Sequence, residues 1–117
     1  MLDFDAKQLE AIGTASLVDR VRVFLAQEFA DARSADQLAL AGEVRARLDD
    51  ARLYGLDTSA AAATFIVLAW LFGGGFERTD DALRALLEDR SRPAHEKRVL
   101  LEVWALGALQ RLRGGPQ

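Results

Sequence analysis

The stretch TSAAAATFIVLAWLFGGG, residues 58–75, decides the fold of this chain. Thr58 precedes an apolar run, residues 60–72, in which Thr64 is the one polar side chain. A threonine directly before such a run is a good N-cap, because its hydroxyl accepts a free amide of the first turn. The three glycines that follow cost too much backbone entropy to continue a helix. The stretch therefore predicts a helix that begins after Thr58 and ends at the glycines.

This helix is either a buried core helix or a membrane span, since no charged residue occurs between Thr58 and Phe76. Its apolar part is about 20 Å long at 1.5 Å per residue, whereas the hydrocarbon core of a bilayer is about 30 Å thick. A short helix that is apolar on all sides belongs in the centre of a bundle. The sequence therefore predicts a buried helix and no membrane partner.

Two amphipathic helices are predicted upstream, because apolar residues recur there at helical spacing. They are Val18, Val21, Leu25 and Phe29 in the first segment, and Leu40, Val44, Leu48 and Ala51 in the second. Asp36 is a cap for the second helix, and Gly55 after its last turn suits the left-handed closing position, from which Leu56 packs back. A start signal at Asp5 precedes both, and whether that first helix continues through Gly13 stays open.

Two more helices are predicted downstream. Asp80 begins a short one, with an Asp80–Arg84 ion pair on its surface and with Leu83, Leu86 and Leu87 facing inward. Pro93 suits the first turn of the last helix, which runs to about Arg113. Residues 1–117 are thus predicted to form a single all-α domain, a compact bundle of about five helices with a buried apolar third helix. The short linkers favour antiparallel neighbours.

Composition excludes several classes of function. The chain of 117 residues has a net charge of −3, no cysteine and one histidine. Disulfides, thiolate metal sites and multi-histidine metal sites are therefore impossible. Nucleic-acid binding is not predicted, because basic residues form no stripe. The acidic N-terminus lacks the pattern of a secretory signal peptide, so the sequence predicts a cytoplasmic protein.

No catalytic constellation is visible. His95 has no second histidine or cysteine beside it and is expected to be a surface residue. The carboxylate pairs Asp49-Asp50 and Asp80-Asp81 consist of adjacent helical residues, whose side chains point about 100° apart. We therefore predict no enzyme, no catalytic residue, no metal and no cofactor. A small-ligand-binding helical bundle, or an enzyme of another design, is the alternative from a different class.

Protein binding is the function that the sequence favours. Arginine and aromatic residues are enriched among interface hot spots, and four of them flank the two glycine-marked turns. They are Arg52, Tyr54, Phe76 and Arg78. We predict that these four form a partner-binding surface at the ends of the second and third helices. Phe76 has two interpretations, because an aromatic side chain in this loop either anchors a partner or plugs the end of the bundle.

A family resemblance suggests which protein is bound. The run Ala51-Arg52-Leu53-Tyr54-Gly55-Leu56-Asp57-Thr58 is followed by Phe65, Leu68, Phe72-Gly73 and Phe76-Glu77, then by Leu86-Leu87-Glu88-Asp89 and a helix with Pro93, Lys97 and Leu101. This pattern, over roughly residues 45–101, resembles small helical proteins encoded beside spike and effector genes of bacterial type VI secretion systems. It departs from them at Ala61-Ala62-Ala63, where an acidic residue is expected, and at Glu77, where aspartate is usual.

The resemblance implies an accessory protein of effector delivery, which binds an effector or spike as an adaptor or chaperone. An immunity protein that neutralises a cognate toxin is the second expectation. Both functions need another protein as the partner, and the sequence leaves the oligomeric state open. The resemblance implies no catalytic residue.

Overall fold

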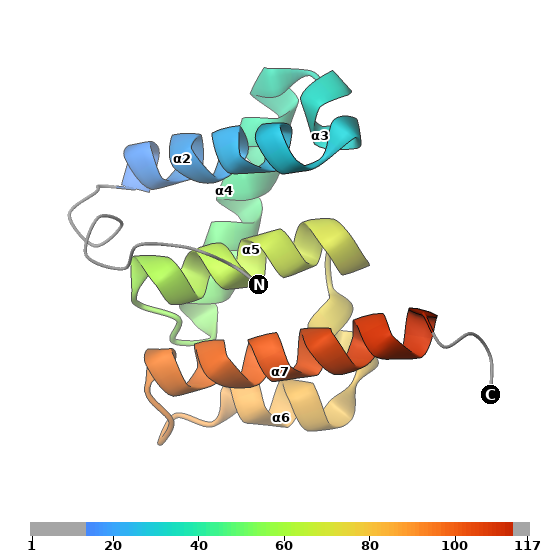
Figure 1. The fold of residues 1–117 in the computed structure, drawn as a ribbon. Coiled ribbons are helices and arrows are strands. Elements are labelled where there is room, and N and C mark those ends of the chain that lie inside the picture. The colour runs from blue at the N-terminus through green and yellow to red at the C-terminus, as the bar shows by residue number, and fades with distance from the viewer. Residues whose placement is uncertain (1–13, 114–117) are drawn as a thin grey trace.

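The computed structural model describes residues 14–113, which form an all-α bundle without strands (Figure 1). Six α-helices and one short 3₁₀ helix follow one another: α2 Thr14–Glu28, α3 Ala30–Ser34, α4 Gln37–Leu53, α5 Ser59–Phe72, η1 Phe76–Thr79, α6 Asp81–Glu88 and α7 Ala94–Arg113. The predicted start at Asp5 and the question of continuity through Gly13 lie outside the described residues.

Helix α5 is the centre of the bundle, as the sequence predicts. Residues 60–69 are all buried, and α5 packs against α2, α4 and α7. The Thr58 hydroxyl accepts the Ala61 amide at 3.2 Å and begins the helix, while the buried Thr64 hydroxyl donates to the Ala60 carbonyl at 2.9 Å. None of the helices in residues 14–113 is both long and apolar enough to cross a membrane.

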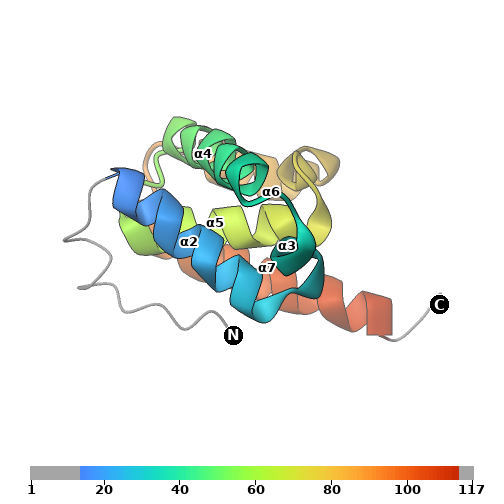
Figure 2. The same cartoon turned by 90° about the horizontal axis from the view of Figure 1, so that it is seen from above.

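Three helices run in the same direction through the bundle. Figures 1 and 2 show α5 between α2 and α7, all three oriented alike, while α4 and α6 carry the chain back. The prediction of antiparallel neighbours concerns helices joined by short linkers, and it does not cover the packed pair α5 and α7, which is parallel. These two helices are parallel because η1 and α6 lie between them in the sequence and return the chain to the end where α5 began.

The first predicted helical segment is divided in two at Phe29. This residue is extended (φ −127°, ψ 121°), so α2 ends before it and α3 begins after it. Arg33 stabilises the break, because its guanidinium donates to the Ala26 and Gln27 carbonyls at 2.9 and 3.0 Å. These carbonyls in the last turn of α2 would otherwise lack helical partners. Val18 and Phe29 are half-buried, and the fully buried face consists of Leu17, Val21, Leu25 and Ala32.

Helix α4 and its end agree with the sequence prediction. The face of Leu40, Val44, Leu48 and Ala51 is buried, and the Asp36 carboxylate caps the start by accepting the Leu38 amide at 3.1 Å. Gly55 has φ +73°. The Gly55 amide donates to the Arg52 carbonyl and the Leu56 amide to the Ala51 carbonyl, both at 3.0 Å. This pair of bonds is the Schellman motif, which requires a left-handed residue at the glycine position.

Asp80 has a different role from the predicted one. One carboxylate oxygen accepts the Leu83 amide at 3.1 Å and caps α6, and the other accepts the Trp104 indole N–H at 3.0 Å. These bonds, that of Trp104 first, lower the pKa of the Asp80 carboxyl below its ordinary value. The predicted Asp80–Arg84 pair is wrong, because Asp80 binds α7 through Trp104 and Arg84 pairs with Glu88 at 3.7 Å.

Candidate functional site

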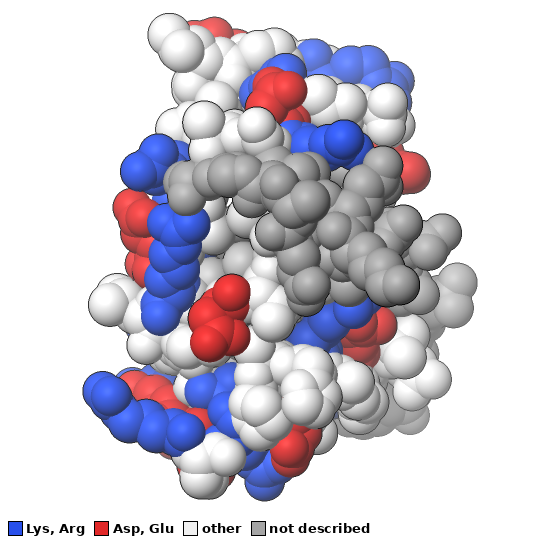
Figure 3. All heavy atoms as spheres, turned by 90° about the vertical axis from the view of Figure 1, so that its left-hand side faces the viewer, with Lys and Arg blue, Asp and Glu red and all other residues white. Residues whose placement is uncertain are grey.

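An open groove of about 820 Å³ lies where α4 ends and α7 begins. Its lining comes from the end of α4, from η1 and from the turn between α6 and α7: Asp50, Arg52, Leu53, Tyr54, Gly55, Asp57, Arg78, Leu87, Glu88, Arg90, Arg92, Pro93, Ala94 and Lys97. Figure 3 looks onto this end of the molecule, where basic and acidic side chains alternate on the surface. We call this depression the groove.

Three of the four predicted partner residues line the groove. Arg52 and Tyr54 come from the last turn and the C-cap of α4, and Arg78 comes from η1. The Schellman turn directs the chain away after Tyr54, which leaves this end of α4 uncovered. The glycine turn with positive φ at Gly73 and Gly75 brings η1 back beside it. Local backbone chemistry therefore brings these three side chains together.

Phe76 does not belong to this surface. Its side chain is only 3% exposed, and its ring lies 5.4 Å from Phe65, 5.4 Å from Trp104 and 6.4 Å from Phe72 between centroids. Such tilted aromatic pairs add to the stability that burial provides. The assignment of Phe76 to the partner-binding residues is therefore corrected: the ring seals the end of the bundle, which was its second interpretation.

Two buried charged side chains lie at the groove, Lys97 in its lining and Glu77 outside it, and both contact Tyr54. We call Tyr54, Glu77 and Lys97 the polar corner. Glu77 is 1% exposed, and its Oε2 accepts the Tyr54 hydroxyl at 2.7 Å and lies 3.7 Å from Arg78 Nε. Glu77 Oε1 is buried without a hydrogen-bond partner among the described residues. Burial first, and then the bond to Glu77, raises the pKa of Tyr54 to about 12.

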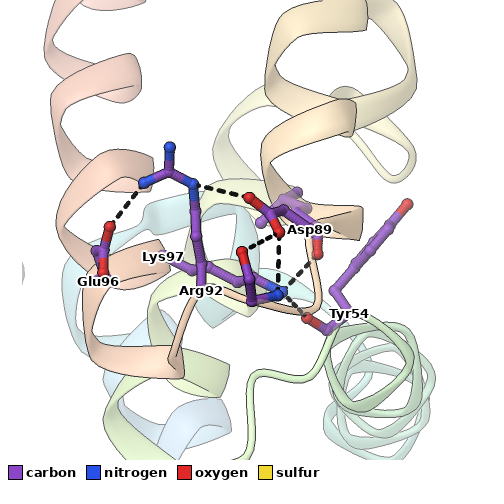
Figure 4. A network of polar contacts seen from close by, with 7 residues as sticks. Tyr54, Asp89, Arg92, Glu96 and Lys97 are labelled. Atoms are coloured by element: carbon purple, nitrogen blue, oxygen red, sulfur yellow. Dashed lines mark hydrogen bonds and ion pairs between the residues drawn. The ribbon is translucent and has the colours of Figure 1, made fainter.

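Lys97 joins three helices at this corner. Its side chain is 3% exposed, and its ammonium donates to the Tyr54 carbonyl at 2.8 Å and to the Leu87 carbonyl at 2.7 Å (Figure 4). These carbonyls lie at the ends of α4 and α6, where helices lack their own donors and carry partial negative charge. Burial lowers the pKa of Lys97, and the nearby carboxylates of Asp89 and Asp57 oppose that shift.

The turn between α6 and α7 is held by Asp89. Its carboxylate accepts the Ser91 amide at 3.0 Å and the Ser91 hydroxyl at 2.6 Å, and these bonds are the main cause of its lowered pKa. Arg92 bridges Asp89 at 3.3 Å and Glu96 at 2.6 Å (Figure 4). This network fixes the turn that contributes Arg90 to the groove.

Leu53 and Arg90 are among the groove residues that sequence reasoning missed. Leu53 is 84% exposed at the end of α4, and Arg90 makes no ion pair with any residue in the described range. Two features of the sequence could have indicated them: an apolar residue opposite the buried face of α4, and two arginines, Arg90 and Arg92, in a short loop.

His95 is exposed, as expected. Within residues 14–113 no three His, Cys, Asp or Glu side chains are grouped as a metal site would need.

Several residues of the sequence pattern in residues 51–101 meet in this region. Tyr54 contacts Phe65, with ring centroids 5.7 Å apart, and also binds Glu77 and Lys97, while Phe76 packs on Phe65. The residues of this pattern therefore hold together the ends of the helices next to the groove.

Comparisons with known proteins identify no relative of this chain. The chain matches no family model, no curated protein and no solved structure.

Proposed function

We propose that this chain is a non-enzymatic protein-binding protein, an adaptor or chaperone for a type VI secretion effector or spike, and that the groove is its binding site. The observation that carries the proposal is the meeting of Arg52, Tyr54 and Arg78 in one groove. The resemblance in residues 45–101 supplies the class of partner.

The chemistry of the groove favours a protein as the ligand. Arginine and tyrosine are over-represented among residues that dominate interface energies, and both offer apolar area together with hydrogen-bond donors. Leu53 adds an exposed apolar side chain at the edge. An open depression with these residues suits a segment of a partner better than a small molecule, because small-ligand sites are enclosed and mostly apolar.

The buried ionisable groups support a binding role over catalysis. The Lys97 ammonium already donates to two backbone carbonyls, and Glu77 accepts the Tyr54 hydroxyl. The Lys97 ammonium and one oxygen of Glu77 therefore have an assigned task in the fold. A catalytic acid or base needs instead to reach the proton of a substrate.

The test is co-purification of the full chain from its own cells, followed by mass spectrometry. We expect an effector or spike protein to be enriched with the wild-type chain and to be lost with the double variant Arg52→Ala and Arg78→Ala. Exposed charges contribute little to stability, so that variant should melt at almost the wild-type temperature. Arg45→Ala is the matched control, because Arg45 is exposed on α4 and does not line the groove.

Other outcomes would overturn the proposal. If the arginine variant retains the effector or spike as well as the Arg45 control does, the binding face lies elsewhere. If the captured protein is a toxin that loses activity on binding, the chain is an immunity protein. If no protein is captured and a small molecule accompanies the pure chain, a ligand-binding bundle takes the place of the adaptor.

A further inference from the structure

We propose that the groove binds an acidic segment of the partner that carries an apolar side chain, with the acids on Arg52, Arg78 and Arg90 and the apolar group on Leu53. This inference rests on the proposed function and specifies the chemistry of the partner at the same site.

The charge of the groove is opposite to that of the whole molecule. Five of its lining residues are basic and three are acidic, whereas the chain carries a net charge of −3. Two of the three acids are engaged by arginines outside the lining: Asp50 pairs with Arg47 at 3.4 Å and Glu88 with Arg84 at 3.7 Å. The third, Asp57, acts electrostatically on the buried Lys97. Of the basic residues, Lys97 is buried and Arg92 pairs with Asp89 and Glu96, so the positive charge that faces solvent belongs to Arg52, Arg78 and Arg90.

Three of the arginines face solvent from three different segments. Arg78 has a side chain that is 66% exposed, although it lies 3.7 Å from Glu77 and also interacts with the Tyr54 side chain. Arg90 has no ion pair with described residues, and Arg52 is exposed at the end of α4. Arginine presents several donors in a planar fork that fits a carboxylate. An extended acidic segment offers several carboxylates to such side chains, whereas a single small anion offers one charged group.

Helix ends at this site would by themselves oppose an anion. α4 and α6 both terminate there, and helix C-termini carry partial negative charge. Lys97 neutralises this effect, because its ammonium binds a carbonyl at each end. The buried lysine therefore offsets the negative potential that the two helix ends place on the groove.

Leu53 supplies the apolar contact for the partner segment, in addition to the charged contacts of the arginines. It is 84% exposed although it is the last residue of α4, directly beside Arg52 and in the groove lining. An interface usually combines an apolar contact with a charged surround. A segment that has a leucine-like residue among its acids matches this arrangement.

The test uses the isotope-labelled full chain and three synthetic peptides as probes: a peptide of glutamates and aspartates with a central leucine, the same peptide with serine in place of leucine, and a lysine counterpart. We expect the acidic leucine peptide to shift the backbone amide signals of residues 52–55 and 88–92 and to bind most tightly. Affinity should fall as salt is raised, because exposed charges are screened beyond about 8 Å at physiological ionic strength.

Matched variants locate the contacts. Arg90→Glu should weaken binding of the acidic leucine peptide by about tenfold, as expected when an attractive interface charge becomes repulsive. Arg20→Glu makes the same charge change at an exposed position outside the groove and should leave the affinity within about twofold. Leu53→Ser should abolish the preference for the leucine peptide over the serine peptide. Leu38→Ser, at the opposite end of α4 and equally exposed at 83%, should preserve it.

Several results would overturn the inference: equal binding of the lysine peptide, signal shifts outside the groove, equal effects of Arg90→Glu and Arg20→Glu, or tighter binding of a single-stranded oligonucleotide. The two proposals fail separately. If co-purification depends on Arg52 and Arg78 but the acidic peptide does not bind, the acidic chemistry is wrong and the adaptor function stands. If both experiments are negative, both proposals fall.

Discussion

The centre of α5 and the polar corner are both buried, yet they are held by different forces. Residues 60–69 of α5 contain one polar side chain, Thr64, whose bond is to its own helix. The polar corner buries Glu77 and Lys97, whose partners come from other segments. Apolar burial is non-directional and depends on area. The corner instead depends on where a few oxygen and nitrogen atoms lie.

This difference predicts how substitutions in each of the two regions affect the stability of the fold. A polar group placed in the apolar centre finds no hydrogen-bond partner, so nothing compensates the free energy lost when the group is removed from water. A group removed from the corner leaves its former partners buried and unsatisfied. The first change threatens the whole fold, and the second should weaken the bundle by a limited amount.

The largest effect is expected for Leu68→Asp in the centre of α5. An unpaired buried carboxylate costs several kcal/mol, about as much as the entire stability of a small domain. We expect circular dichroism to show no cooperative thermal transition. Leu71→Asp is the control, because Leu71 lies on the same helix but is 40% exposed, and it should fold. A nearly unshifted melt for Leu68→Asp would mean that α5 is not the centre.

The next effect is expected for Lys97→Met in the polar corner. Methionine fills similar space but cannot donate to the Tyr54 and Leu87 carbonyls, so the loss should be about 2 kcal/mol, as for buried groups left without partners. Chemical denaturation measures it. Val99→Met, at an exposed position on the same helix, should change the free energy of unfolding by less than about 0.5 kcal/mol. Equal stabilities of these two variants would show that the ammonium does not join the helix ends.

A smaller effect is expected for Gly55→Val, which tests the turn between the two regions. A Cβ on Gly55 would meet only Lys97 Nζ at 3.7 Å, so space is sufficient and the cost comes from φ +73°. The left-handed penalty predicts a loss of about 1–2 kcal/mol. Gly42→Val on α4 is the matched control, because nothing lies near its Cβ position and its φ is not positive. If both valine variants are equally stable, the Schellman turn does not constrain the end of α4.

The smallest effect at neutral pH concerns the Tyr54 proton. The chain has a single tyrosine, so the absorbance of tyrosinate reports Tyr54 alone. Its native pKa is raised to about 12, whereas an unfolded tyrosine titrates near 10. The native state therefore keeps a proton that the unfolded state has lost, and stability should fall as pH rises from about 10 through about 12. Glu77→Gln should lower the native pKa toward 10, and an unchanged value would leave burial as the only cause.

The separate parts of the fold were predictable to different degrees. The caps at Asp36 and Thr58, the Gly55 turn and the buried face of α4 follow from local chemistry, and all four were predicted correctly. The break at Phe29 was not predicted, because the periodicity of apolar residues does not encode the bonds from the Arg33 side chain to the Ala26 and Gln27 carbonyls that stabilise it.

The groove was predicted in part. Arg52, Tyr54 and Arg78 flank two glycine-marked turns, so their proximity could be inferred from the ends of neighbouring helices. Arg90 could not be placed there, because its position depends on the parallel return of α7 beside α5. Phe76 had two interpretations in the sequence, and only the aromatic rings around it decide between them.

The sequence by itself determined the all-helical class, both ends of α4 and α5 and the burial of α5, because capping, glycine backbone freedom and apolar periodicity act over a few residues. Only the tertiary structure decided which helices are parallel, that Phe76 is sealed inside, and that Lys97 on α7 binds the ends of α4 and α6. These contacts join residues that are up to 43 positions apart in the chain. Their partners are backbone carbonyls, which every residue carries, so the sequence holds no local sign of the pairing.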